Sequence, residues 1–111
     1  MTKKEYAIYL HDKSYNCCQA VVCSFCQETG IDEITAFKMA EGFGLGMGNT
    51  EGPCGALAGA IMVAGLMNST ANLDGDKSKA GTYQIAKELT DSFIVKNQVS
   101  FIFSLNLINF A

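Results

Sequence analysis

Five cysteines carry the most distinctive chemistry of this chain, and two of them have settings that the other three lack. Cys17 follows Asn16, which forms a capping-box pattern with Gln19, so we expect Cys17 in the first turn of a helix. Cys54 follows Pro53, a residue favoured at the first helical position, and we place it at the start of another helix. Helix N-termini lower a thiol pKa and favour the thiolate. We therefore predict that Cys17 and Cys54 are the reactive thiols.

A glycine-rich stretch, "GFGLGMG", lies just ahead of Cys54 at residues 42–48. Glycines permit positive φ angles and let backbone amides come close to a sulfur, a metal or an anion. On this reading Gly44, Gly46, Gly48 and Gly55 would line a binding site over Cys54. The alternative is that these glycines only permit a tight crossing between two helices.

The remaining cysteines are interpreted differently. Cys23 and Cys26 form a CxxC motif, but redox motifs of this kind follow a strand at a helix start, whereas these residues are predicted within a helix. We interpret them as small buried hydrophobic residues. Cys18 points about 100° away from Cys17 around the helix, so it is a core residue or a spare thiol. If Cys17 and Cys54 hold a metal ion or an Fe–S cluster, Cys18 is the third candidate ligand.

Composition limits the classes of partner. The chain has 111 residues, 17% of them charged, and a net charge of -3, so we expect neither nucleic acid nor anionic lipid as a partner. The apolar run at residues 54–67 is shorter than the roughly 20 residues of a membrane span. The N-terminus has no apolar segment typical of a signal peptide. We predict a cytoplasmic protein.

The spacing of apolar residues predicts an all-α fold, a compact bundle of about five helices with the glycine-rich loop ahead of a central apolar helix. The third helix has Asp32 as its cap, Ile34, Phe37 and Met39 as apolar positions, and Gly42 as its stop. The expected helices are residues 3–12 after a Thr2 cap, 17–29 before Gly30, 33–41, 53–68 and one from Lys79 to about 94. We assign residues 1–98 to one cysteine-bearing domain and 99–111 to a divergent apolar tail.

Small residues recur at four-residue spacing in the central helix, as Gly55 and Gly59 and as Ala56, Ala60 and Ala64. Such a seam lets a second helix backbone approach closely. Together with the apolar tail, it also suggests a non-catalytic alternative. On that reading the chain is a helical assembly module, most simply a homodimer.

Three segments together resemble a known family: "YNCCQAVVCSF", "GFGLGMG" and "CGALAGAIMVAGL". They are similar to the small bacterial and archaeal redox-active proteins named for their C-GCAxxG-C-C cysteine pattern. Cys17 matches the first family cysteine, and Cys54, Gly55, Ala56 and Gly59 match the second segment. The resemblance covers roughly residues 5–97.

The family pattern ends in two further cysteines, and this chain has none after Cys54. The resemblance implies thiol redox or electron transfer, by disulfide exchange or by a thiolate-bound metal or Fe–S centre, with a redox partner that the sequence does not name. The loss of two cysteines argues against a four-thiolate cluster. We therefore predict a site built from Cys17 and Cys54, with help from Cys18.

Overall fold

The computed structural model describes residues 1–44, 47–48, 54–75 and 77–96, with the side chains of 93–96 left aside. Within these ranges all regular secondary structure is helical, without strands, which confirms the predicted all-α fold. The elements are α1 (Lys3–Asp12), α2 (Cys17–Ser24), α3 (Cys26–Thr29), α4 (Glu33–Ala40), a 3₁₀ turn η1 (Glu41–Phe43), α5 (Gly55–Asn68) and α6 (Lys79–Lys96).

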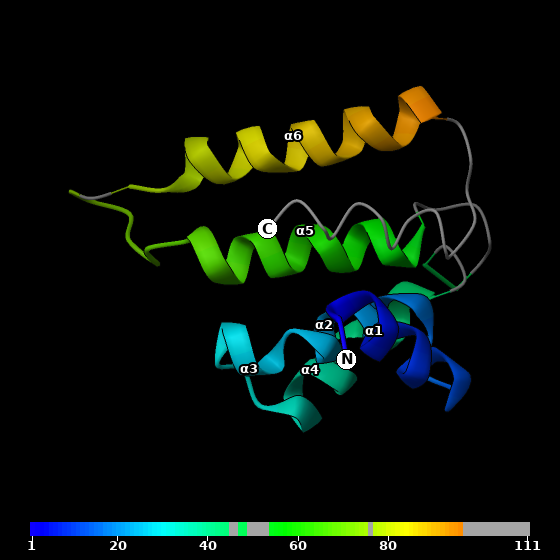
Figure 1. Cartoon of the computed structure of the whole chain (residues 1–111). Helices are drawn as coiled ribbons and strands as arrows, with labels where there is room; N and C mark the ends of the chain where they lie inside the picture. The colour runs from blue at the N-terminus through cyan, green and yellow to red at the C-terminus, as the bar shows by residue number, and fades with distance from the viewer. Residues whose placement is uncertain (45–46, 49–53, 76, 97–111) are drawn as a thin grey trace.

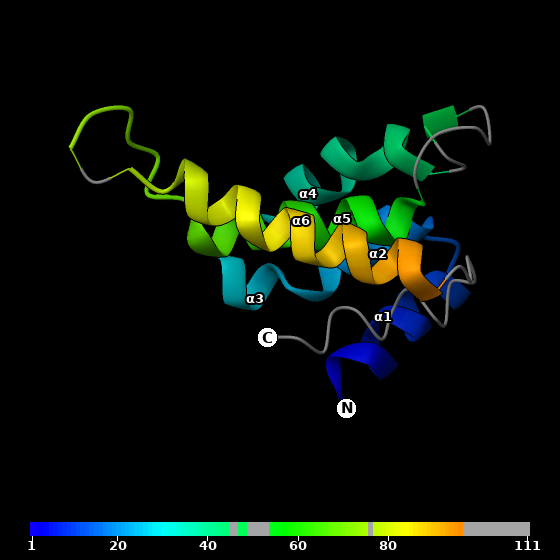
Figure 2. The same cartoon turned by 90° about the horizontal axis from the view of Figure 1, so that it is seen from above.

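The apolar helix α5 lies in the middle of the molecule, as predicted. Helix α6 runs antiparallel to it on one side, and the shorter helices α1–α4 gather on the other side (Figure 1). Seen from above, α6 lies over α5 (Figure 2). Helix α2 packs directly on α5 and is flanked by α1 and α4. The first cysteine-bearing helix is thus sandwiched between its neighbours.

Local capping signals set the starts of three helices. Thr2 and Asn16 form complete capping boxes with Glu5 and Gln19, and Asp32 accepts a hydrogen bond from the Thr35 backbone N–H. Each side chain satisfies a backbone donor that the helix itself leaves unpaired. All three predicted caps are confirmed.

The second predicted helix is interrupted at Phe25, so the described residues form six α-helices where about five were predicted. The buried Ser24 hydroxyl donates to the Val21 carbonyl at 2.7 Å, and the Phe25 N–H bonds to the Val22 carbonyl at 3.2 Å, one residue short of the α-helical partner. A serine that bonds back to the preceding turn competes with the helical ladder. The chain continues as α3. This helix ends just before Gly30, as predicted, and Gly30 caps it with φ of 77°.

Helix α4 differs from its prediction in both its end and its buried face. It ends at Ala40, and Gly42 lies inside the following 3₁₀ turn instead of stopping the helix. Ala36 and Ala40 are fully buried, whereas Ile34 is 67% exposed and Met39 is 48% exposed. The small alanines let α4 approach α2 closely. Ile34 and Met39 therefore point outward, whereas Phe37 is partly buried and packs against the core, as predicted.

The small-residue seam packs α5 against α2 within one chain. A Cβ atom at Gly59 would lie 3.0 Å from the Val21 Cβ and 3.2 Å from the Cys18 carbonyl oxygen. Contacts this close leave no room for a side chain at Gly59. The expectation of tight helix packing is therefore confirmed. In the described part of the chain, no helix is both long enough and apolar enough to span a membrane.

Candidate functional site

Cys17 begins α2, as predicted, and its position is fixed by two polar residues. The Asn16 side chain accepts a hydrogen bond from the Gln19 N–H at 2.9 Å, and the Asn16 N–H donates to the Gln19 side chain at 3.0 Å. The Cys17 side chain is half-buried and packs against the core beneath α5. The thiol therefore lies at the helix start on a rigid support.

Cys54 is the N-cap of α5, one position ahead of the first helical residue, and Pro53 lies outside the described residues. Its carbonyl accepts the first helical hydrogen bond, from the Ala58 N–H at 3.0 Å. Cys54 is half-buried and packs against the same core cluster as Cys17. A negative charge on Cys54 would raise the pKa of Cys17, so the two thiols are electrostatic neighbours.

The pKa of Cys17 is raised above its ordinary value of 9.0, which corrects the prediction of an acidic thiol. Burial of the sulfur is the largest cause, and the neighbouring Cys54 is the second. A hydrogen bond from the Cys17 backbone works in the opposite direction and is outweighed. Desolvation of the thiolate thus exceeds the stabilisation that a helix start provides. At neutral pH Cys17 is a protonated thiol.

Gly55 lets the two cysteine-bearing segments meet. A Cβ atom there would lie 3.0 Å from the Phe43 carbonyl oxygen, 3.1 Å from the Cys18 amide nitrogen and 3.3 Å from the Cys17 Cβ. This observation favours the packing explanation for this glycine. The start of α5 is pressed against the start of α2 because position 55 has no side chain.

The glycines of the loop have separate settings. A Cβ at Gly44 would lie 2.5 Å from the Asn16 side-chain nitrogen, so this position must stay small to admit the cap of α2. Gly48 has φ of 88°, a conformation suited to glycine. Gly46 lies outside the described residues. Binding of a cofactor by Gly44, Gly46, Gly48 and Gly55 stays a prediction.

A polar bridge between α2 and the end of α4 was missed by sequence reasoning. The Asn16 side chain donates to the Glu41 carbonyl at 2.9 Å, and the Gln19 side chain, 3% exposed, donates to the Phe37 carbonyl at 3.1 Å. The capping box identified both residues, but it revealed only their local bonds. Asn16 and Gln19 also fasten the start of α2, and with it Cys17, to the neighbouring helix.

Cys18 belongs to a different part of the core. It is fully buried, its thiol donates to the Met62 sulfur at 3.9 Å, and burial raises its pKa to about 12. Across the described residues, no group of three or more His, Cys, Asp or Glu side chains is placed to hold a metal ion. The proposed ligand set of Cys17, Cys18 and Cys54 stays a prediction, with Cys18 directed toward a thioether.

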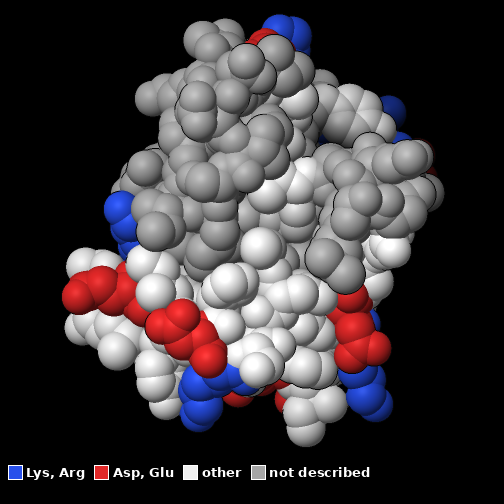
Figure 3. All heavy atoms as spheres, turned by 90° about the vertical axis from the view of Figure 1, so that its right-hand side faces the viewer, with Lys and Arg blue, Asp and Glu red and all other residues white. Residues whose placement is uncertain are grey.

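The charge distribution agrees with the composition. On the face drawn in Figure 3, lysines lie near the rim, several beside acidic side chains, and they do not gather into one patch. The described residues in the middle of this face are uncharged. The absence of a nucleic-acid partner stays a prediction.

A comparison with protein families shows to which family the chain belongs. Residues 15–101 match the family described as "Putative redox-active protein (C_GCAxxG_C_C)". The chain belongs to this family. The match includes both Cys17 and Cys54, so the two neighbouring thiols lie within the family region. Comparison with curated proteins and with solved structures found no match.

Proposed function

We propose that this member of the redox-active family carries out thiol–disulfide exchange with Cys17 and Cys54 as the two exchanging sulfurs. One observation carries the proposal: a Cβ atom at Gly55, the residue after Cys54, would lie 3.3 Å from the Cys17 Cβ, so the starts of α2 and α5 bring two half-buried thiols close together. The effect of a Cys54 charge on the pKa of Cys17 supports this pairing.

The proposed reaction is a two-electron exchange with a disulfide-bearing substrate. One protein thiol loses its proton and attacks a substrate sulfur, which forms a mixed disulfide and releases the other substrate half as a thiolate. The second protein thiol then attacks the bound protein sulfur and releases the remaining half. The protein ends with a Cys17–Cys54 disulfide, and the substrate ends as two thiols.

Disulfide exchange fits the described ligand set better than a metal or an Fe–S centre does. Fe–S clusters are generally held by four cysteine thiolates, and structural zinc sites by four ligands. The close approach of the Cys17 and Cys54 segments supports a two-thiol exchange, while the Cys18 thiol is directed toward the Met62 sulfur. The metal alternative would need a ligand from outside the described residues or from another molecule.

Tryptic mapping without reduction tests the proposal. Lys38 separates residues 14–38, which contain Cys17, from residues 39–77, which contain Cys54. Protein oxidised by cystine is expected to yield these two peptides joined by one disulfide. Treatment with a dithiol reductant should separate them.

Three variants identify the sulfurs involved. Cys17→Ser and Cys54→Ser should each abolish the joined peptide, whereas Cys18→Ala should retain it. If folded, oxidised wild-type protein gives the two peptides unlinked, or if Cys18→Ala alone removes the link, the proposed pairing is wrong. Circular dichroism before digestion checks that each variant is folded.

Homodimerisation stays a prediction with weaker support than before. The small-residue seam of α5 is occupied by α2 of the same chain, and the apolar tail lies outside the described residues. Of the two features that suggested assembly, only the small-residue seam lies in the described residues, and it packs against a helix of the same chain. The cytoplasmic location and the redox partner likewise stay predictions.

A further inference from the structure

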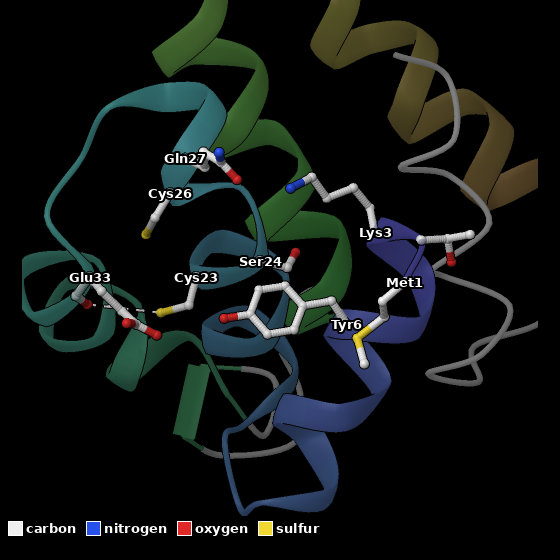
Figure 4. Close-up of a pocket in the computed structure, with 9 residues that line it drawn as sticks. Met1, Lys3, Tyr6, Cys23, Ser24, Cys26, Gln27 and Glu33 are labelled. Carbon is white, nitrogen blue, oxygen red and sulfur yellow. Dashed lines mark hydrogen bonds between the residues drawn. The ribbon is translucent and has the colours of Figure 1, made fainter.

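A second pair of cysteines faces a cavity away from the starts of α2 and α5. The cavity has a volume of about 400 Å³ and lies between the start of α1, the junction of α2 with α3, and the start of α4. Cys23 and Cys26 both line it, with Tyr6 and Glu33 beside them (Figure 4). The cysteines of the CxxC motif are therefore not both enclosed in the core.

The interruption at Phe25 distinguishes this motif from two cysteines on a regular helix. In a continuous helix, residues three apart have Cβ atoms roughly 5–6 Å apart. A disulfide requires about 3.5–4.5 Å. Here α2 ends at Ser24 and α3 begins at Cys26, with Phe25 at φ of -106° and ψ of 9°. Because of this break, the Cβ atoms of Cys23 and Cys26 are not held at the separation of a regular helix.

The two thiols are electrostatic neighbours that differ in exposure. Burial is the largest effect on both: it raises the pKa of Cys23 to about 12 and the pKa of Cys26 above its ordinary value, and a charge on Cys26 adds to the shift of Cys23. Cys23 is 3% exposed, whereas Cys26 is half-buried at the cavity.

Both sulfurs also have backbone acceptors on the surrounding helices. The Cys23 thiol lies 3.9 Å from the Glu33 carbonyl oxygen, and the Cys26 thiol lies 3.8 Å from the Val22 carbonyl oxygen. In Figure 4 the two sulfurs point into the space between α3 and the start of α4. They are thus held near each other by three elements.

The geometry points to Cys23 and Cys26 as a second dithiol–disulfide pair, with Cys26 attacking first and Cys23 resolving, that reacts with small-molecule disulfides of the size of cystine. Cys26 gives up its proton to solvent, and the resulting thiolate attacks one sulfur of cystine, which forms a mixed disulfide and releases one cysteine thiolate that takes up a proton. Cys23 gives up its proton to solvent and attacks the Cys26 sulfur, releasing the second cysteine. The protein pair is oxidised by two electrons, and one cystine becomes two cysteines.

The test uses the full chain with Cys17→Ser and Cys54→Ser, so its outcome does not depend on the first pair. This variant keeps three thiols, Cys18, Cys23 and Cys26. The folded protein is equilibrated with cysteine–cystine mixtures, quenched with acid, and alkylated by N-ethylmaleimide after denaturation. Intact mass should fall from three adducts to one as cystine increases. Fragmentation should then locate the disulfide between Cys23 and Cys26.

Two further substitutions test the order of attack. Adding Cys23→Ser should leave one half of cystine attached to Cys26. Adding Cys26→Ser should leave Cys23 reacting at least tenfold more slowly. Capture at Cys23 first, or a disulfide that includes Cys18, would overturn the assignment.

Folding and reagent controls keep each outcome informative. Circular dichroism verifies that each variant is folded, and the same protein unfolded in guanidinium shows that the redox mixture can oxidise these thiols. Three adducts at every cystine ratio in the folded protein, together with oxidation of the unfolded protein, would show that Cys23 and Cys26 are core residues without redox function.

Discussion

The two cysteine pairs of this protein are built in opposite ways. Cys17 and Cys54 come from segments far apart in sequence and meet only because α2 packs on α5. Cys23 and Cys26 are three residues apart and meet across a local break in one helical segment. One pair therefore depends on the tertiary structure, and the other depends mainly on the chain between its members.

A comparison of the two pairs shows how burial and position within a helix each affect the pKa of a thiol. Cys17 stands at a helix start and Cys23 near a helix end, yet burial is the largest cause of a raised pKa in both. Helix position alone is therefore a poor guide to thiol acidity when the sulfur is removed from water. The pairs should differ instead in how strongly their oxidation is linked to folding.

Oxidation should have the largest effect, and it should be larger for the pair that is distant in sequence. Closing the loop from residue 17 to residue 54 is expected to stabilise the fold by about 4 kcal/mol, against about 2 kcal/mol for the short Cys23–Cys26 loop. Urea unfolding of the oxidised and reduced protein, compared between Cys17→Ser/Cys54→Ser and Cys23→Ser/Cys26→Ser, measures both values. Equal gains from the two pairs would contradict the comparison.

Separating α2 from α5 should affect only the distant pair. Gly59→Val places a side chain against Val21 and the Cys18 carbonyl, so we expect a loss of about 3 kcal/mol in the free energy of unfolding. The yield of the Cys17–Cys54 disulfide should fall, while Cys23 and Cys26 still pair. Urea unfolding and tryptic mapping measure the two effects.

Gly65→Ala is the matched control within the same helix. Among the described residues, and apart from the helix's own backbone, no atom lies within 4 Å of a Cβ built at Gly65, so alanine should be tolerated and should stabilise the helix by up to about 1 kcal/mol. If Gly65→Ala disturbed the Cys17–Cys54 pair as much as Gly59→Val did, the close α2–α5 approach would not be the cause.

Removing the polar support of Cys17 should have an intermediate effect. Asn16→Ala removes the cap of α2 and the bond to the Glu41 carbonyl, at an expected cost of about 2 kcal/mol. Asp32→Ala removes the cap of α4 and should cost about 1 kcal/mol. Only Asn16→Ala should slow oxidation of the Cys17–Cys54 pair, which stopped-flow exchange with cystine would measure.

The contribution of Cys18 to the loss of stability at alkaline pH should be the smallest effect of the four. The Cys18 thiol keeps its proton in the folded chain up to about pH 12, whereas the same thiol ionises near 9.0 once unfolded. The folded state therefore binds more protons between these values, and stability is full below pH 9 and falls as pH rises above it.

Cys18→Ala should remove about 1 kcal/mol of the stability loss between pH 8 and pH 10. Urea unfolding at each pH measures this difference. Val21→Ala, which empties a buried site without removing an ionisable group, should lower stability by a similar amount at every pH. A Cys18→Ala profile parallel to that of the wild type would show that this thiol is not the cause.

Helix starts could be predicted from the sequence because they depend on residues within one turn. Thr2, Asn16 and Asp32 each accept a bond from a backbone donor three positions later, which spacing alone reveals. The break at Phe25 was missed because Ser24 lies in a sequence with good helical spacing. Its signal was a serine able to bond to the preceding turn, a weak indication by itself.

The buried face of α4 could not be read from hydrophobicity. Ile34 and Met39 are more apolar than Ala36 and Ala40, yet only the alanines are buried, because close approach to α2 favours small side chains. The second role of Asn16 was equally hidden. Its acceptor, the Glu41 carbonyl, is distant in sequence and carries no side-chain signal.

The sequence by itself determined the all-α fold, the three caps, the central position of the apolar helix and the family to which the chain belongs. These properties follow from short-range spacing, composition and residue pattern. Only the tertiary structure decided which thiols are neighbours and how burial shifts their pKa values. Both depend on atoms from separate helices, and on the removal of water between them, which a linear pattern does not specify.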